Sequence, residues 1–375
     1  MRSRQLFSTA TDEGTVEVAL VEVPVADPGD DEVLVRVEAA PVNPSDLGQM
    51  FGPADLGTVR PAHDRQVGVV ADVPEAARPM LAPRVGIPIP VGAEGAGVVV
   101  AAGSSAAAQA LLGRTVATLG GGMYAEYRVL AADQCLLLPD GVMPAQAASC
   151  FVNPLTALGM IDTMRLDGHH ALVHTAAASS LGQMLVKLCL DDGVPLVNVV
   201  RRSEQVELLR RLGARFVCDS SEPRFTSALT DALAETDATI AFDAVGGGTL
   251  AGDLLAAMEV AQSGKGSAIR GYGSTVHKQV YVYGGLDRSP IELSRRFGPA
   301  WSVGGWLLPL FLDRVGPERA QVLREHVANE ITTTFATSYN ATVSLDEMLS
   351  VDTVAKYARL ATGEKYLVEP NRAGG

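Results

Sequence analysis

The sequence contains few cysteines, and those that it has are scattered. Its four cysteines, Cys135, Cys150, Cys189 and Cys218, include no C-x-x-C pair. Disulfide frameworks and structural zinc sites both depend on closely placed cysteines. We therefore expect neither of them, and we interpret the four residues as reduced, mostly buried thiols of a cytoplasmic protein.

Positive charge and long apolar runs are also scarce. The chain has 30 Lys and Arg residues against 43 Asp and Glu residues, which gives a net charge of −13. Nucleic-acid binding depends on clustered positive charge, so we expect no nucleic-acid partner.

A membrane-spanning helix needs about 18 apolar residues in a row. The longest candidate, residues 306–312, is interrupted by Pro309, and no long apolar segment follows residues 1–5. We therefore expect neither a membrane span nor a signal peptide.

The remaining composition is typical of a soluble α/β enzyme. With 375 residues, 47% of them hydrophobic and 19% charged, the chain is long enough for two domains. About the first 140 residues predict short strands separated by Gly and Pro turns, which indicates a barrel-like, β-rich domain. From residue 145 the pattern alternates between helix and strand, as in a parallel sheet. Residues 291–324 predict an apolar helical segment, and residues 333–368 predict mixed structure.

The segment from residue 171 to residue 202 is the most informative part of the chain. A short apolar strand (171–175) precedes small residues (176–182), a helical stretch and a second apolar strand (196–200). This order is that of the βαβ unit that binds dinucleotides, in which the pyrophosphate lies at the helix N-terminus. Of the G-x-G-x-x-G template only Gly182 remains, because Ala177 and Ser179 occupy the other glycine positions. An ordinary α/β turn without a ligand therefore remains an alternative.

The end of the second strand carries positive charge. NAD-binding units place an acidic residue about 20 residues beyond the glycines, where it binds the ribose 2′-hydroxyl. At that distance this chain has Arg201, followed by Arg202. A guanidinium pairs with a 2′-phosphate through charge-assisted hydrogen bonds, whereas a carboxylate repels it. The sequence thus predicts NADPH as the cofactor, and two surface arginines at a strand end are the alternative.

Several motifs occur in the order of a known family. They are Val42-Asn43-Pro44-Ser45-Asp46, Gly92-Ala93-Glu94-Gly95-Ala96-Gly97, Tyr124-Ala125-Glu126-Tyr127, Asn153-Pro154-Leu155-Thr156-Ala157, the turn at residues 176–182, Leu212-Gly213-Ala214, Phe242-Asp243-Ala244-Val245-Gly246-Gly247 and Tyr283-Gly284-Gly285. With these motifs the chain resembles the medium-chain dehydrogenase/reductase superfamily, in its zinc-independent quinone oxidoreductase and enoyl reductase-like branch. The resemblance implies an α/β fold in which a Rossmann doubly wound parallel sheet is inserted in a GroES-like, barrel-like β-rich catalytic domain. The expected domains are 1–149, completed by 289–375, and 150–288.

Two departures from the family pattern narrow the chemistry that the resemblance implies. Zinc-dependent members have a cysteine at or near the position of Asn43 and a His-Glu pair in the Gly-rich turn, where this chain has Ala93 and Glu94. Because catalytic zinc needs three protein ligands, we expect no metal. Enoyl reductases carry a tyrosine soon after the Asn-Pro motif as a candidate proton donor, where this chain has Phe51-Gly52-Pro53. That difference argues against reduction of an enoyl thioester.

Without a metal, hydride transfer needs an acceptor that stabilises the developing negative charge itself. Quinones and α,β-unsaturated carbonyls do so by conjugation, and the protein aligns the reactants and donates hydrogen bonds. The candidate catalytic residues are Asn43, alternatively a turn residue before Pro44, and Thr156, alternatively a helix N-cap. No proton donor stands out among the residues, and water could serve. The candidate cofactor-binding residues are Asn153, Ala178, Ser179, Ser180, Leu181, Gly182, Arg201, Arg202, Val245, Gly246, Tyr283, Gly284 and Gly285.

The predicted function is therefore an NADPH-dependent, zinc-independent reduction of a quinone or an α,β-unsaturated carbonyl. Two alternatives remain: an enoyl-thioester reductase, and a catalytically weak NADPH-binding sensor or structural protein. The resemblance also implies a homodimer formed by joining sheet edges, for which residues 279–283 are the expected edge strand.

Overall fold

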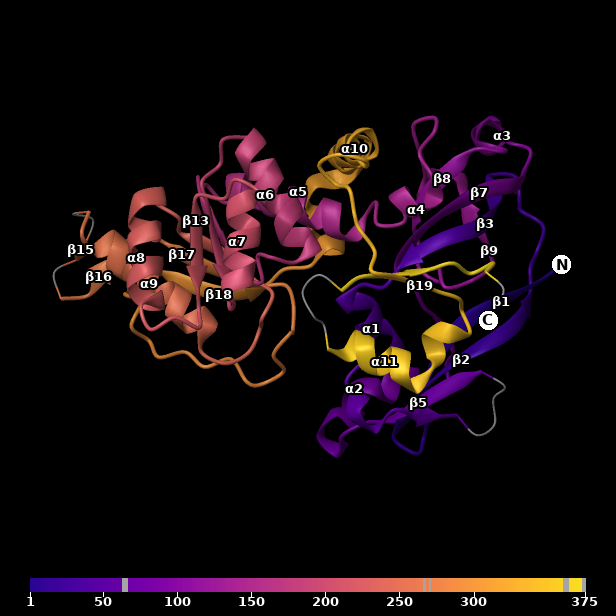
Figure 1. Cartoon of the computed structure of the whole chain (residues 1–375), viewed down its shortest axis with the longest axis horizontal. Helices are drawn as coiled ribbons and strands as arrows, with labels where there is room; N and C mark the ends of the chain where they lie inside the picture. The colour runs from indigo at the N-terminus through magenta and orange to yellow at the C-terminus, as the bar shows by residue number, and fades with distance from the viewer. Residues whose placement is uncertain (63–66, 266–267, 270, 360–363, 373–375) are drawn as a thin grey trace. The chain divides into compact units, whose positions relative to one another are not determined.

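The computed structural model describes residues 1–62, 67–265, 268–269, 271–359 and 364–372 (Figure 1). Its backbone contacts divide the chain into two compact units. Unit 1 comprises Met1–Val152 together with Arg324–Gly375, and unit 2 comprises Asn153–Leu323. The chain therefore leaves unit 1, builds unit 2 without interruption, and then returns to complete unit 1.

Unit 1 is built mainly from two sheets, which are antiparallel except for the parallel pair of β19 and β20. The first has the order β4-β5-β2-β1-β6. The second has the order β10-β8-β7-β3-β20-β19, with β9 also paired to β3. The strands are β1 (Arg2–Ala10), β2 (Thr15–Pro24), β3 (Glu32–Pro41), β4 (Arg60–Pro61), β5 (Gly68–Asp72), β6 (Ile89–Pro90), β7 (Glu94–Ala102), β8 (Thr115–Leu119), β9 (Tyr127–Ala131), β10 (Cys135–Leu137), β19 (Ala341–Val343) and β20 (Tyr366–Val368).

Short helices connect these strands. The α-helices of unit 1 are α1 (Pro44–Phe51), α2 (Arg78–Leu81), α3 (Ala106–Leu111), α4 (Pro144–Ala147) and α11 (Val351–Ala358). The 3₁₀ turns are η1 (Leu56–Thr58), η2 (Glu75–Ala77), η3 (Ala82–Arg84), η4 (Ala132–Gln134) and η5 (Glu347–Leu349). Strand residues such as Leu6, Val18 and Val35 form one core, because alternate residues of half-buried strands point to the same side. Phe51 of α1 belongs to the same core.

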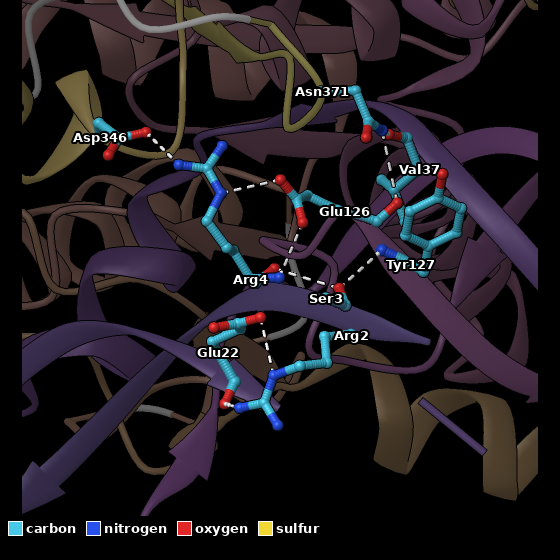
Figure 2. Close-up of polar contacts among 9 residues, drawn as sticks. All are labelled: Arg2, Ser3, Arg4, Glu22, Val37, Glu126, Tyr127, Asp346 and Asn371. Atoms are coloured by element: carbon cyan, nitrogen blue, oxygen red, sulfur yellow. Dashed lines mark hydrogen bonds and ion pairs between the residues drawn. The ribbon is translucent and has the colours of Figure 1, made fainter. Parts of the chain in front are cut away.

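Polar contacts attach the C-terminal segment to the first strands (Figure 2). The Arg4 guanidinium lies 2.8 Å from carboxylate oxygens of both Glu126 and Asp346. The Asn371 amide donates to the carbonyl oxygen of Val37 over 2.7 Å. Strand β20 also pairs with β3, with Leu367 opposite Pro41. The returning chain is thus part of unit 1 rather than an appendage to it.

Unit 2 contains a six-stranded parallel sheet in the order β13-β12-β11-β14-β17-β18. Its strands are β11 (Leu172–His174), β12 (Leu196–Val200), β13 (Phe216–Asp219), β14 (Ile240–Asp243), β17 (Lys278–Val282) and β18 (Trp301–Gly305), and a small two-stranded sheet pairs β15 (Ala268–Ile269) with β16 (Gly273–Ser274). All residues of β11, β12 and β14 are buried, as expected for parallel strands covered on both faces. This strand order is that of the doubly wound dinucleotide-binding sheet, which confirms the predicted fold class.

The helices of unit 2 alternate with these strands. They are α5 (Val152–Leu166), α6 (Ser180–Asp191), α7 (Ser203–Arg211), α8 (Phe225–Thr236) and α9 (Leu250–Ser263). A further helix, α10 (Leu308–Asn329), crosses from unit 2 into unit 1 and is broken at Gly316, which has a φ of 79° and precedes Pro317. A proline inside a helix removes a backbone hydrogen bond, and here it follows directly on that break.

The expectation of helix throughout residues 291–324 was wrong in its first part. Residues Trp301–Gly305 form β18, which pairs in parallel with β17. Trp301 and Val303 pack against the core of unit 2, so burial on the sheet prevails over the local pattern. The chain accordingly stays with unit 2 until Leu323, which lies beyond the return expected at residue 289.

The position of β18 also shows that the predicted edge strand of this sheet was wrong. Residues 279–283 were expected to lie at the edge of the sheet, but β17 lies between β14 and β18. Its backbone groups are therefore engaged on both sides, with Gln279 opposite both Ile240 and Ser302. The edge strand on this side of the sheet is β18.

Candidate functional site

The turn between β11 and α6 is shaped by the close approach of helix and strand. Ser179 is the N-cap of α6, and its hydroxyl accepts a hydrogen bond from the N–H of Gly182 over 3.2 Å. A Cβ added to Gly182 would lie 2.1 Å from the carbonyl oxygen of Ala177. Gly182 therefore allows helix–strand packing, the role of the third glycine in the dinucleotide template. Serine at the position of the second glycine caps the helix.

A buried aspartate organises the neighbouring loop at the end of β14. Asp243 accepts a hydrogen bond from the Thr175 hydroxyl over 2.7 Å and from the N–H of Val245 over 2.9 Å. A Cβ on Gly246 would lie 2.4 Å from the carbonyl oxygen of Gly284. The ends of β14 and β17 thus approach more closely than side chains would permit. Among the predicted cofactor residues, this brings Val245 and Gly246 beside Gly284.

Arg201 and Arg202 lie at the carboxyl end of β12, and both are exposed. The N–H of Arg201 donates to the side-chain oxygen of Gln205 over 3.1 Å, which fixes the backbone where α7 begins. In the part of the chain that the structure describes, neither guanidinium forms an ion pair. Both positive charges therefore remain available to an anion at the edge of the sheet where the α6 turn also lies.

His174 and Tyr283 link the ends of β11 and the β17 segment. The His174 Nε2 lies 2.7 Å from the Tyr283 hydroxyl, and their rings stack with centroids 5.8 Å apart. Burial lowers the pKa of His174 to about 3, so the imidazole is neutral at physiological pH. Burial, followed by the charge of Asp243, raises the pKa of Tyr283. Tyr283, a predicted cofactor residue, thus has its hydroxyl engaged within the protein.

In unit 1, Asn43 belongs to a buried polar cluster. Its amide Nδ2 donates to Glu94 Oε1 over 2.9 Å, and its backbone N–H donates to Asp46 over 2.8 Å. The other Glu94 oxygen accepts the N–H groups of Phe151 and Val152 over 2.8 and 2.9 Å. Asn43 occupies the N-cap position of α1 before Pro44, but its side chain binds Glu94 instead of capping the helix. A role as a turn residue therefore does not explain the hydrogen bond that its side-chain amide donates to Glu94.

The charges in this cluster perturb one another. Burial raises the pKa of Asp46 to about 6, against the opposing hydrogen bonds from the N–H groups of Asn43 and Ala93. Burial also raises the pKa of Glu94, while the positive charge of Lys365 lowers it. Burial lowers the pKa of Lys365, against the charges of Glu94 and Asp46. Titratable groups perturbed in this way are enriched at functional sites.

The two candidate catalytic residues belong to different units. Asn43 is in unit 1, while Thr156 is a buried residue inside α5 and therefore not the helix N-cap that was its alternative reading. Asn153 is partly buried near the start of the same helix. The remaining predicted cofactor residues fall into the α6 turn (Ala178, Ser179, Ser180, Leu181, Gly182), the β12 end (Arg201, Arg202) and the loops after β14 and β17 (Val245, Gly246, Tyr283, Gly284, Gly285). The parallel register places these three groups along the carboxyl edge of one sheet.

The sequence prediction did not include Asp46, Lys365, Thr175 and Asp243 among the functional residues. Asp46 and Asp243 stand in motifs that were recognised, so a search for buried carboxylates beside those motifs could have found them. Lys365 precedes a strand of three residues and carries no local signal. Its place beside Asn43 depends on the pairing of β20 with β3, which links the two ends of the chain.

Two other features are absent from the part of the chain that the structure describes. Within the described ranges, no group of three His, Cys, Asp or Glu residues is arranged to hold a metal ion. Among the helices that the structure describes, none is both long and apolar enough to span a membrane.

These features define a class of protein: an α/β protein with a doubly wound sheet whose carboxyl edge carries a narrow small-residue turn and two free guanidinium groups. Residues 29–140 match the family model of the alcohol dehydrogenase GroES-like domain. The whole chain is similar to the crystal structure of a Mesorhizobium loti protein inferred to be an NADPH:quinone reductase. The TM-score is 0.72 and the identity 26%, and the alignment covers 98% of each chain.

Curated relatives agree with this structural likeness. A mitochondrial enoyl-[acyl-carrier-protein] reductase of Caenorhabditis elegans is 27% identical over 217 residues, which cover 56% of this chain and 55% of that protein. A quinone oxidoreductase of Pseudomonas aeruginosa is 31% identical over 169 residues, which cover 44% of this chain and 52% of that protein. The chain thus spans about half the length of these two relatives. The chain is thus similar to proteins named quinone oxidoreductase and enoyl reductase, and its residues 29–140 match a GroES-like domain.

Proposed function

We propose that this protein is an NADPH-dependent oxidoreductase that transfers a hydride to a quinone or an α,β-unsaturated carbonyl. The observation that carries the proposal is the pair of free guanidinium groups, Arg201 and Arg202, on the sheet edge that also carries the Gly182 turn. The named relatives support the acceptor class, because quinone reductases and enoyl reductases both act on conjugated acceptors.

The residues present fit a dinucleotide phosphate. The absence of a side chain at Gly182 lets α6 begin close against the strand, where backbone N–H groups and the helix dipole favour a pyrophosphate. Arg201 and Arg202 would hold the 2′-phosphate by charge-assisted hydrogen bonds. Asp243 and Thr175 keep the loop at Val245 and Gly246 in place for the ribose. When bound, the reduced nicotinamide supplies the hydride.

The residues on the acceptor side are proposed to orient the substrate. The amide of Asn43 is fixed by Glu94, so it presents one conformation to its surroundings. Such preorganised groups stabilise charge that develops on an acceptor oxygen without having to rearrange during the reaction. Thr156 offers a hydroxyl on the rigid scaffold of α5. A conjugated acceptor spreads the developing charge itself, and on this proposal the reaction needs no zinc.

Replacing Arg201 by Glu tests the cofactor assignment. A carboxylate at this position would repel a 2′-phosphate, and we expect the dissociation constant of NADPH to rise on the order of 100-fold while that of NADH changes less than about threefold. Fluorescence titration with both nucleotides measures the two constants. Arg211→Glu on the adjacent helix is a matched control, since it makes the same charge change at an exposed residue beyond the first turn of α7. Equal weakening of NADPH and NADH would contradict the phosphate contact.

An enoyl thioester is the second candidate substrate, favoured by the relatives named enoyl-[acyl-carrier-protein] reductase. In this chain the position of the expected tyrosine donor is Phe51, which is fully buried in the core of unit 1. NADPH oxidation with matched panels of quinones, enones and enoyl thioesters distinguishes the substrates. The absence of turnover with every panel, combined with tight NADPH binding, would instead support a nucleotide-binding sensor.

The assembly and location of the protein also remain proposals. A homodimer formed by joining sheet edges would use β18, which is the edge strand, in place of residues 279–283. Sedimentation of the purified protein tests the dimer. A cytoplasmic location rests on the scattered, free cysteines alone.

A further inference from the structure

Two buried polar atoms of unit 1, one of them on the candidate catalytic residue Asn43, have no hydrogen-bond partner. They are the ammonium Nζ of Lys365 and the amide Oδ1 of Asn43. Asn43 donates through Nδ2 to a carboxylate, which fixes Oδ1 as the opposite, accepting atom. An unsatisfied buried polar atom costs on the order of 1–3 kcal/mol, so such atoms in a native structure need an explanation.

The backbone holds Lys365 firmly beside the Asn43 segment. Its N–H donates to the side-chain oxygen of Asn340 over 3.0 Å, and its carbonyl accepts the N–H of Asn340 over 2.8 Å. The next residue, Tyr366, accepts the N–H of Val42 over 3.0 Å, one residue before Asn43. The position of Lys365 therefore does not depend on a contact made by its ammonium.

A structural ion pair does not account for this lysine. In unit 2 the buried Lys278 shows the ordinary arrangement, in which Nζ donates to Glu259 over 2.7 Å. Lys365 lies within electrostatic reach of Glu94, but the Glu94 oxygens are bound to Asn43 Nδ2 and to two backbone N–H groups. The ammonium is thus stabilised by nearby charge while its hydrogen-bonding capacity remains unused.

The chemistry of the two unpartnered atoms defines what fits between them. An ammonium only donates hydrogen bonds, and an amide oxygen only accepts them. One atom that satisfies both must accept from Nζ and donate to Oδ1. A water molecule or a hydroxyl can do so, whereas a carbonyl oxygen has no hydrogen to donate.

We propose that Lys365 and Asn43 hold one water molecule between Nζ and Oδ1, and that this water carries a proton from Lys365 to the reduced acceptor. The inference rests on the proposed function and names the proton source that the sequence does not reveal. Lys365 is a positioning residue here, since it acts on the acceptor through the water.

The proton transfer balances the hydride transfer. The hydride brings its electron pair into a new C–H or O–H bond of the acceptor and leaves a negative charge on the conjugated oxygen. One O–H bond of the water breaks as that oxygen takes the proton. An N–H bond of the Lys365 ammonium then breaks to restore the water, and solvent later returns a proton to the neutral amine. No further oxidant or reductant is needed.

The surroundings of Lys365 suit this role. Burial weakens its hold on the proton and lowers its pKa, while the charges of Glu94 of β7 and Asp46 of α1 act in the opposite direction. Other titratable groups face the same carboxylates: the phenol of Tyr124 interacts with Asp46, Glu94 and Tyr357, and the thiol of Cys150 and the phenol of Tyr339 interact with Glu94. A lysine that holds its proton less tightly than usual gives that proton up more readily than an exposed lysine does.

Two substitutions separate proton supply from charge and packing. Lys365→Met keeps the length of the side chain without a proton, and Lys365→Arg keeps the charge but holds its proton too tightly to release it. We expect kcat to fall on the order of 100-fold in both, with NADPH affinity by fluorescence titration changed less than about threefold. In the wild type, kcat should fall at alkaline pH as Lys365 loses its proton, and this alkaline decrease should be absent from Lys365→Arg. The wild type should also show a solvent deuterium isotope effect on kcat of about twofold or more.

The outcomes are distinguishable. An active wild type together with variants whose kcat stays within about threefold would overturn the role of Lys365 alone, as would full activity of Lys365→Arg with an unchanged alkaline decrease. A wild type that oxidises NADPH with no conjugated acceptor would overturn the proposed function and this role together. Where Lys365→Met fails to fold, Lys365→Met/Glu94→Gln removes the uncompensated carboxylate as well, and the same loss of kcat is expected in a folded protein.

Discussion

At the scale of single residues, His174 shows how burial makes one side chain sensitive to pH. It lies fully buried in β11, and its pKa of about 3 is far below the ordinary value of 6.5. A group whose folded-state pKa is lowered binds its proton more weakly in the folded protein than in the unfolded chain. Its contribution to stability is therefore complete at neutral pH and is lost as the pH falls from about 6.5 toward 3.

The substitution His174→Gln tests this effect, because glutamine can still bond the Tyr283 hydroxyl but does not titrate. Between pH 7 and pH 5 we expect the wild type to lose about 2 kcal/mol more unfolding free energy than the variant. Denaturant unfolding at the two pH values measures the difference. Parallel curves for wild type and His174→Gln would show that His174 is not held neutral.

Residues of the site differ in how far the sequence predicted them. Gly182 was predictable, because the steric requirement for a glycine there is local to one strand–turn–helix unit. Asn43 was found by its motif, but its partner Glu94 and the nearby Lys365 come from segments far apart in the chain. Local patterns carry no information about such contacts.

At the scale of elements, α9 is joined to the strands that follow it by a buried ion pair. Lys278 of β17 is fully buried and binds Glu259 of α9, and the second Glu259 oxygen accepts the N–H of Ser274 in β16 over 2.7 Å. Glycine is required at positions 273 and 298, because a Cβ at either would lie within about 2.5 Å of the Glu259 carboxylate. One carboxylate thus fixes the helix against the turn that leads into the sheet.

Breaking this pair should be costly. We expect Lys278→Met to lower the unfolding free energy by about 3–5 kcal/mol, because it leaves a buried carboxylate without its counter-charge. Lys278→Met/Glu259→Gln should recover most of the loss, since the amide oxygen can still accept from Ser274. Arg2→Met, which removes the exposed ion pair with Glu22, is the control and should cost less than about 1 kcal/mol. Chemical denaturation measures all three, and equal losses for Lys278→Met and Arg2→Met would contradict the role of burial.

Most elements of unit 2 were predictable, because buried parallel strands are short apolar runs between clear breaks. β18 was the exception. In residues Trp301–Gly305 the apolar–polar alternation extends only from Trp301 to Val303 before two glycines, and these residues become a strand by pairing with β17. Its exposure at the edge is decided by the order of the sheet, which no single segment determines.

At the scale of the whole molecule, the two units differ in how they are encoded. Unit 2 is one continuous segment with its own core, whereas unit 1 needs both ends of the chain. β20 completes a sheet of unit 1, and Arg4 binds Asp346 of the returning segment. Independent folding is therefore expected of unit 2 and not of the N-terminal part alone.

Separate expression of residues 153–323 and 1–152 tests this difference. We expect the first fragment to unfold cooperatively on heating and the second to lack a cooperative transition, because its sheet has lost β19 and β20. Circular dichroism during thermal unfolding gives the comparison, and adding residues 324–375 to the second fragment should restore its transition. A cooperative transition for residues 1–152 alone would show that the returning segment is dispensable.

The sequence by itself determined the local units of this protein: the strand–turn–helix at residues 171–191, the alternation that produces a parallel sheet, and the motifs by which it resembles the medium-chain dehydrogenase/reductase superfamily. These depend on spacing, side-chain size and backbone freedom within a few residues. Only the tertiary structure decided the edge strand β18, the return of the chain after residue 323, and the meeting of Asn43, Glu94 and Lys365. Those features arise from burial and pairing between distant segments, and the free energy of such contacts exists only once the whole chain has folded.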